Sequence, residues 1–139
     1  LDFGFESIKL YFIAGLPGET LEDLDQTVDL IENVRQCVEA RGKMLTTAFS
    51  GFVPKRGTPW QDQACQDPAE LKKRFAYVKT AIRHLPGSIK TLFESPSHIA
   101  RQAYLCSAGP QLAEEYEIEA QEWKKRGSFS LKSDSVWDF

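Results

Sequence analysis

Cysteine is scarce in this chain, and its arrangement excludes two common structural roles. The 139 residues include three cysteines, Cys37, Cys65 and Cys106. An odd number at such wide spacing fits neither a secreted disulfide framework nor a C-x-x-C metal-binding pair. The two histidines, His84 and His98, have no cysteine or carboxylate spaced to complete a ligand set with them. We therefore expect no metal site built from these residues alone.

Long apolar runs and an excess of charge of one sign are missing as well. The longest apolar run, residues 10–16, is far shorter than the roughly 20 residues that span a bilayer. No series of basic, apolar and small residues at the start indicates a signal peptide. With 17 Lys and Arg against 20 Asp and Glu, the net charge of −3 gives no broad attraction to nucleic acid or anionic lipid. We expect a cytoplasmic protein with no membrane and no nucleic acid among its partners.

What is present is the composition of a folded domain. Apolar residues make up 42% of the chain and aromatic residues 12%, which is enough to form a hydrophobic core. The chain begins at Leu1 and enters a dense apolar segment within a few residues. We therefore expect it to be a fragment of a longer protein.

The first half of the chain has the pattern of a strand, a helix and a second strand. Residues 7–14 (SIKLYFIA) are almost wholly apolar, which predicts a central strand covered on both faces. Thr20 and Asp23 are spaced as a capping box before a helix with an apolar stripe, whose solvated face would include Arg35. Residues 45–53 (LTTAFSGFV) predict the next strand. A long helix between two such strands is the connection that parallel pairing requires.

The second half of the chain is predicted to be mainly helical. The fold class is therefore α/β, with a βαβ portion in residues 1–63 and a helical extension in residues 64–139. Because two parallel strands leave unpaired edges, we expect self-association, strand exchange or an added antiparallel strand. The elements expected in this half are helices over 68–85, 95–107 and 112–126, the last with Tyr116 and Trp123 on one side, a short strand over 88–93 that could be the antiparallel partner, and a loop from 127 to the end.

Two turn sequences should lie side by side at the carboxyl edge of the predicted sheet, where α/β proteins bind their ligands. The first is GLPGET (15–20), in which backbone N–H groups and Gly15 would suit an anion, although a strand-to-helix turn needs glycine and threonine even without a ligand. The second is PKRGTPWQ (54–61), in which Lys55 and Arg56 could hold a carboxylate or phosphate or simply form a solvated turn.

The segments IKLYFIAGLPGETLEDL (8–24) and FSGFVPKRGTPWQ (49–61) together resemble the second half of a radical S-adenosylmethionine (SAM) barrel. In that superfamily a late strand ends in a G-[LF]-P-G-E-T turn, and the next strand runs into a P-[KR]-x-x-T-P-x-Q-like loop. The match covers about residues 5–63. The later segment SPSHIARQAYLCSAG (95–109) resembles, more weakly, a helix end of the cobalamin-binding-domain type, often labelled Fe–S oxidoreductase.

The resemblance implies a partial TIM-like barrel, of which this chain holds two or three strands. The barrel binds SAM against a 4Fe-4S cluster and cleaves it to a 5′-deoxyadenosyl radical that abstracts hydrogen from a substrate. By the same resemblance Ile13 and Gly15 line the adenine side of the SAM site, and Phe52 and Val53 contact adenine. The cobalamin-binding type adds cobalamin to the cofactors that the parent could use.

The chain departs from this superfamily in lacking the C-x-x-x-C-x-x-C motif that binds the cluster. We therefore expect a missing N-terminal part of the parent to hold the cluster and the isolated chain to be inactive. Lys55 and Arg56 would face the substrate, whose identity these residues do not indicate. The alternative is a small α/β binding or interaction module without chemistry of its own.

Overall fold

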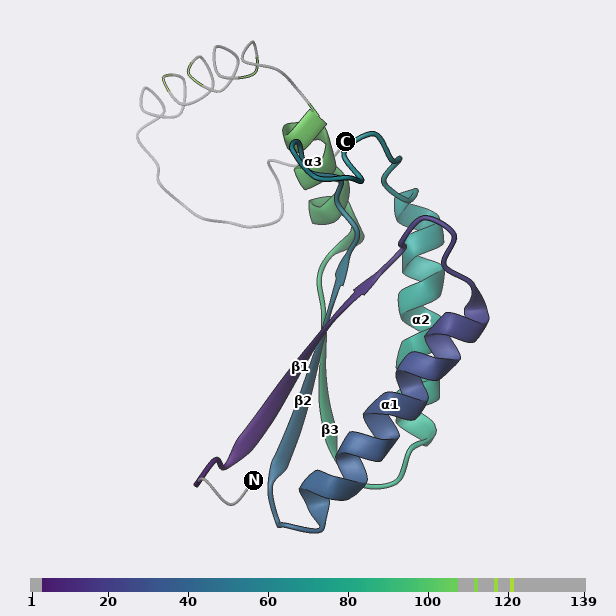
Figure 1. Ribbon diagram of the computed structural model, residues 1–139, viewed down its shortest axis with the longest axis vertical. Coiled ribbons are helices and arrows are strands. Elements are labelled where there is room, and N and C mark those ends of the chain that lie inside the picture. Colours follow the sequence, from purple (N-terminus) through teal and green to yellow (C-terminus); the bar gives the residue numbers. More distant parts are fainter. Residues whose placement is uncertain (1–3, 108–111, 113–116, 118–120, 122–139) are drawn as a thin grey trace. The chain divides into compact units, whose positions relative to one another are not determined.

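The computed structural model describes residues 4–107 and the single positions 112, 117 and 121 (Figure 1). Residues 1–107 form one unit and residues 108–139 a second. The helix expected over 112–126, with Tyr116 and Trp123, and the loop from 127 lie almost wholly outside the described residues. The first unit contains the elements β1 (Ser7–Ala14), α1 (Leu21–Glu39), β2 (Met44–Gly51), α2 (Pro68–His84), β3 (Ile89–Phe93) and α3 (Pro96–Ser107).

Three parallel strands form the sheet of this unit. They lie in the order β1-β2-β3, with Ser7 opposite Met44 and Phe49 opposite Phe93. Strands with helices between and after them confirm the α/β class. The expectation of an antiparallel strand over 88–93 is wrong, because helix α2 returns the chain to the amino end of the sheet before β3 begins. Strand β3 therefore runs in the same direction as β2.

The start of α1 is held as the sequence predicts. Asp23 N–H donates to Thr20 Oγ1 at 3.3 Å, and Thr20 N–H donates to the Asp23 carboxylate at 2.7 Å, which completes the capping box. The prediction that Arg35 lies on the solvated face of the helix is wrong, because its side chain is only 8% exposed. The guanidinium pairs with the carboxylates of Glu32 and Glu39 on the same helix. Pairing compensates the charge, so Arg35 can lie against the core.

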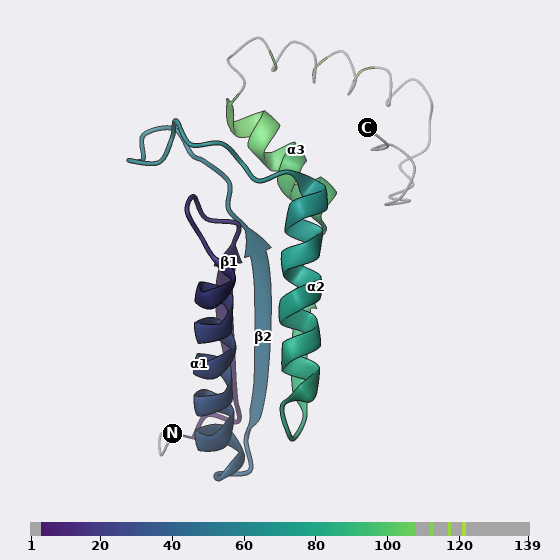
Figure 2. The same ribbon diagram turned by 90° about the vertical axis from the view of Figure 1, so that its right-hand side faces the viewer.

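Helices α1 and α2 cover the same face of the sheet, and the hydrophobic core lies between the two layers (Figures 1 and 2). Phe12, Phe49 and Phe93 stack across the three strands, with successive ring centroids 5.0 Å apart. Phe75 of α2 packs on Phe93 with a centroid distance of 5.2 Å. The in-register stack fixes the order and alignment of the strands.

No described element covers the opposite face of the sheet, so the expectation that residues 7–14 are covered on both faces is wrong. Exposure alternates along β1, and the side chains of Tyr11 and Ile13 are 75% and 55% exposed. Strand β1 is also an edge strand of the described sheet and not a central one. The described residues supply one layer of helices, which can cover only alternate side chains of a strand.

Helix α2 and strand β3 belong to the same unit as β1 and β2. Asp67 caps α2 by accepting hydrogen bonds from the N–H groups of Ala69 and Glu70. The helix buries Leu71 and Phe75 in the common core. The division expected between residues 63 and 64 therefore falls inside this unit.

Candidate functional site

A groove of about 590 Å³ lies at the carboxyl edge of the sheet. It is formed by the ends of β1 and β2, the loop that follows β2, the residue after β3 and one side chain of α3. Four residues singled out from the sequence line this carboxyl-edge groove, namely Ile13, Phe52, Val53 and Lys55. Their convergence follows from parallel pairing, which brings strand ends that are far apart in the sequence to one edge.

The wall of the groove is apolar and partly aromatic. The Trp60 and Phe52 rings meet edge to face with centroids 5.4 Å apart. Trp60 thereby packs on the residue after β2 and also lines the groove. Ile13 points into the groove from the open face of β1. Such a wall suits a flat, weakly polar group such as a purine ring.

Polar side chains complete the lining, and three of them are charged or carry an amide. Lys55 brings a cation from the loop after β2, and Glu94 brings an acid from the residue after β3. Gln102 of α3 donates a hydrogen bond to the Glu94 carboxylate at 3.1 Å. Sequence reasoning missed Glu94 and Gln102. Glu94 carries the same signal as Lys55, because it follows a strand at the carboxyl edge, whereas Gln102 carries no local signal.

Arg56 does not share the groove with Lys55. Its guanidinium donates a hydrogen bond to the carbonyl oxygen of Ser107 at 2.8 Å and so ties the loop to the end of α3. The two neighbouring basic residues therefore do different things. Lys55 faces the groove and Arg56 holds the helix beside it.

Gly15, the first residue of the GLPGET turn, is buried and lies outside the groove lining. Its φ is +79°, and a Cβ atom there would lie 3.0 Å from Gln66 Oε1, so glycine is needed for both conformation and space. Its N–H donates to Glu19 Oε2 at 2.9 Å. The carboxylate that this amide binds is therefore one from the same turn.

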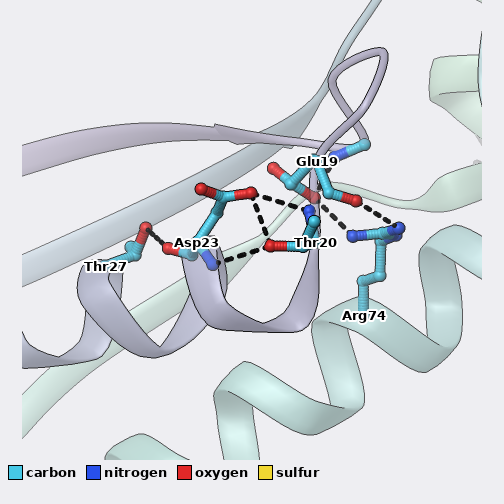
Figure 3. A network of polar contacts seen from close by, with 6 residues as sticks. Glu19, Thr20, Asp23, Thr27 and Arg74 are labelled. Atoms are coloured by element: carbon cyan, nitrogen blue, oxygen red, sulfur yellow. Dashed lines mark hydrogen bonds and ion pairs between the residues drawn. The ribbon is translucent and has the colours of Figure 1, made fainter.

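An ion pair between α2 and the turn holds that carboxylate in place (Figure 3). Arg74 Nη1 donates to Glu19 Oε2 at 2.8 Å, and Arg74 Nη2 donates to the Glu19 backbone carbonyl at 3.0 Å. The Glu19 side chain is only 6% exposed. The GLPGET turn is thus a closed structure whose polar groups bond to one another and to Arg74. No sequence pattern predicted Arg74, because it lies 55 residues away from Glu19.

The cysteines do not form a metal site in the part of the chain that the structure describes. All three are free thiols, and no group of three Cys, His, Asp or Glu side chains among the described residues could hold a metal ion. Cys65 donates a hydrogen bond to the Phe52 carbonyl oxygen at 3.3 Å, and burial raises the pKa of its thiol. These residues therefore do not fit an iron–sulfur cluster, which requires several thiolates converging on one point.

Comparison with known proteins gives partial matches. No protein-family model matches the chain, and no solved structure matches it. An uncharacterized protein of Methanocaldococcus jannaschii is 27% identical over 81 residues, which are 58% of this chain and 17% of that relative. The tRNA-2-methylthio-N(6)-dimethylallyladenosine synthase of Desulfitobacterium hafniense is 41% identical over 69 residues, 49% of this chain and 13% of the enzyme. The same enzyme of Bordetella petrii is 42% identical over 64 residues, 45% of this chain and 12% of the enzyme.

The chain spans less than a fifth of the length of each of these relatives. The tRNA-modifying relatives are radical SAM enzymes, so the matches relate part of the chain to that superfamily. They give no indication of the cobalamin-binding type. Within the described residues, no helix is both long and apolar enough to cross a membrane.

Proposed function

We propose that this chain is part of a radical SAM enzyme and supplies one side of its SAM-binding site. The observation that carries the proposal is the carboxyl-edge groove, which is lined by Ile13, Phe52 and Val53. Those are three of the four residues for which the motif resemblance implies contact with the adenine side of SAM. The partial similarity to radical SAM enzymes supports the same assignment from an independent direction.

Each groove residue has a proposed role. Ile13 and Val53 would pack against the faces of the adenine ring, with Trp60 closing the groove beside Phe52. Gly15 would act indirectly by allowing the tight turn that ends β1. Lys55 would meet an anionic group of SAM or of the substrate, and Arg56, also assigned to the substrate side, would hold α3 next to it. SAM itself, when reductively cleaved, supplies the radical chemistry.

The iron–sulfur cluster belongs elsewhere in this proposal. The described residues do not fit a cluster, so the part of the parent outside this chain would hold it, and this chain alone would not cleave SAM. That missing part would be the chain's main partner and would cover the open edge of β1. Cobalamin is not included, because neither the relatives nor the described residues bear on it.

The proposal can be tested by measuring the iron and acid-labile sulfide content of the full-length parent after anaerobic reconstitution. We expect about four irons per parent and none on the 139-residue chain, with SAM cleavage by the parent alone. A parent without a cluster would overturn the enzyme assignment.

A matched pair of substitutions tests the groove itself. Ile13→Asp should weaken SAM binding by the parent at least tenfold in equilibrium dialysis, because it puts a charge against the adenine. Tyr11→Asp, on the same open face but outside the groove lining, should leave binding within twofold. Equal effects of the two substitutions would remove the groove from the SAM site.

The second candidate function is a non-catalytic interaction module, and one observation favours it. The open face exposes the large apolar side chains of Tyr11, Met44 and Leu92, which are 75%, 68% and 42% exposed. Exposed apolar side chains gathered on a sheet face indicate a surface that another protein covers. A cluster-free parent together with a dimer of this chain in light scattering would favour the module.

A further inference from the structure

A second groove, of about 610 Å³, lies between helix α2 and strand β3. It shares no lining residue with the carboxyl-edge groove. Ile82 and Phe93 give it an apolar floor, and Lys79 and Arg83 stand on its helical side. We call it the α2–β3 groove. An inference about it is independent of the radical SAM proposal.

The strand side of this groove offers unpaired backbone groups. Glu94 N–H donates to the Phe49 carbonyl at 2.9 Å, which fixes the alternation of hydrogen bonds along β3. In a parallel pair, residues on one strand point their N–H and C=O groups alternately toward and away from the partner. The groups of Ile89, Thr91 and Phe93 therefore point away from β2. No strand among the described residues pairs with that side.

The helix side of the groove is positively charged. Lys79 and Arg83 lie one turn apart on α2, and neither forms an ion pair with the residues that the structure describes. The carboxylate of Glu39, which lies beside Gly87 of the groove lining, is already paired with Arg35. A partner with negative side chains would therefore find two uncompensated cations.

The spacing of the two cations matches that of alternate residues in a strand. Side chains four residues apart on a helix have Cβ atoms about 5–6 Å apart. Alternate residues of a strand lie about 6.8 Å apart on one face. Carboxylates at positions i and i+2 of an extended segment could thus reach Lys79 and Arg83 at the same time, while its backbone pairs with β3.

We propose that the α2–β3 groove binds an extended acidic segment of a partner protein, which adds to β3 as a fourth strand and continues the parallel pairing of the sheet. Backbone hydrogen bonds to Ile89, Thr91 and Phe93 would hold the segment. Two acidic side chains in alternate positions would pair with Lys79 and Arg83 and select the partner.

The probe for this proposal is a fluorescently labelled, capped TETETET peptide, titrated into the 139-residue chain and followed by fluorescence anisotropy. Lys79→Glu and Arg83→Glu should each weaken binding at least fivefold. Lys72→Glu makes the same charge change on an exposed lysine of the same helix outside the groove lining, and it should change binding less than twofold. Circular dichroism would verify that all three variants fold.

A second peptide separates strand addition from simple charge attraction. TEPEPET has the same charge as TETETET but lacks the N–H groups of two threonines. In a segment parallel to β3 whose glutamates face Lys79 and Arg83, those two N–H groups point toward β3, so TEPEPET cannot complete the backbone pairing. We expect it to bind at least tenfold more weakly. Equal binding of the two peptides, no binding of TETETET at millimolar concentration, or equal effects of the Lys79 and Lys72 substitutions would each overturn the proposal.

Discussion

The two turns at the carboxyl edge of the sheet look alike in sequence and differ in structure. Both follow parallel strands, and both combine glycine, proline and charged residues. In GLPGET the one charged side chain, Glu19, accepts from the Gly15 N–H within the turn and from Arg74 of α2. In PKRGTPWQ, Lys55 and Trp60 line an open groove instead. The comparison shows that a glycine-rich turn at the carboxyl edge of a sheet can serve the fold while its neighbour lines an open groove.

The largest effect should come from opening the closed turn. Arg74→Ala leaves the Glu19 carboxylate, 6% exposed, without its cation, and should lower the free energy of unfolding by about 3 kcal/mol. Urea denaturation of the 139-residue chain measures it. Lys73→Ala removes the neighbouring, exposed partner of Glu70 and should hardly move the midpoint. Similar effects of the two substitutions would mean that Arg74 does not brace the turn.

A smaller effect is expected where β2 enters the groove region. A Cβ atom on Gly51 would lie 2.6 Å from Leu71 Cδ2 and 2.8 Å from Ile99 Cγ2. Gly51→Ala should therefore cost about 2 kcal/mol through overpacking between α2 and α3. Gly57, in the open loop, has φ +79° and no atoms near its Cβ position.

Two causes can make a glycine necessary: lack of space, as at Gly51, and a positive φ, as at Gly57. Replacing each glycine by asparagine as well as by alanine distinguishes these causes in urea denaturation. At Gly57, asparagine should be better tolerated than alanine, because it adopts positive φ more readily. At Gly51 the larger asparagine should be worse than alanine. The opposite order at Gly51 would show that packing does not require glycine there.

The capping box gives the third effect. Thr20→Ala should destabilise the chain by about 1 kcal/mol, as loss of an N-cap does. Hydrogen bonds from the Thr20 backbone and side chain hold the pKa of Asp23 below its ordinary value of 3.8. A lowered carboxyl pKa stabilises the fold above pH 3.8, and this contribution disappears as the pH falls through the lowered value.

An NMR titration of Asp23 tests this last point. The pKa of Asp23 should rise part of the way toward its ordinary value in Thr20→Ala, which removes the hydroxyl hydrogen bond and keeps the one from the backbone N–H. In Thr27→Ala, which removes only the hydroxyl that donates to the Asp23 carbonyl, the pKa should stay low. An unchanged Asp23 pKa in Thr20→Ala would show that the Thr20 hydroxyl does not contribute to the shift.

Local features of this fold could be predicted from the sequence, and features that join distant segments could not. The caps at Thr20 and Asp67 depend on residues two or three positions away, so the chain itself displays them. The Glu19–Arg74 pair joins residues 55 positions apart, and no pattern in either segment predicts this contact. The carboxyl-edge groove could be predicted in part. Its location follows from the parallel strands, but the contribution of Gln102 from α3 could not be read from the sequence.

The smallest effect on stability should come from Lys55, which separates binding from stability in the second turn. Lys55 is exposed and faces the groove, so Lys55→Ala should change the free energy of unfolding by no more than about 0.5 kcal/mol. The same substitution should weaken SAM or substrate binding by the parent. Arg74→Ala, in contrast, should act mainly by lowering the free energy of unfolding. If Lys55→Ala lowered stability as much as Arg74→Ala and left binding unchanged, the second turn would be as closed as the first. Ligand binding at this edge would then have to rest on Glu94 and the aromatic wall.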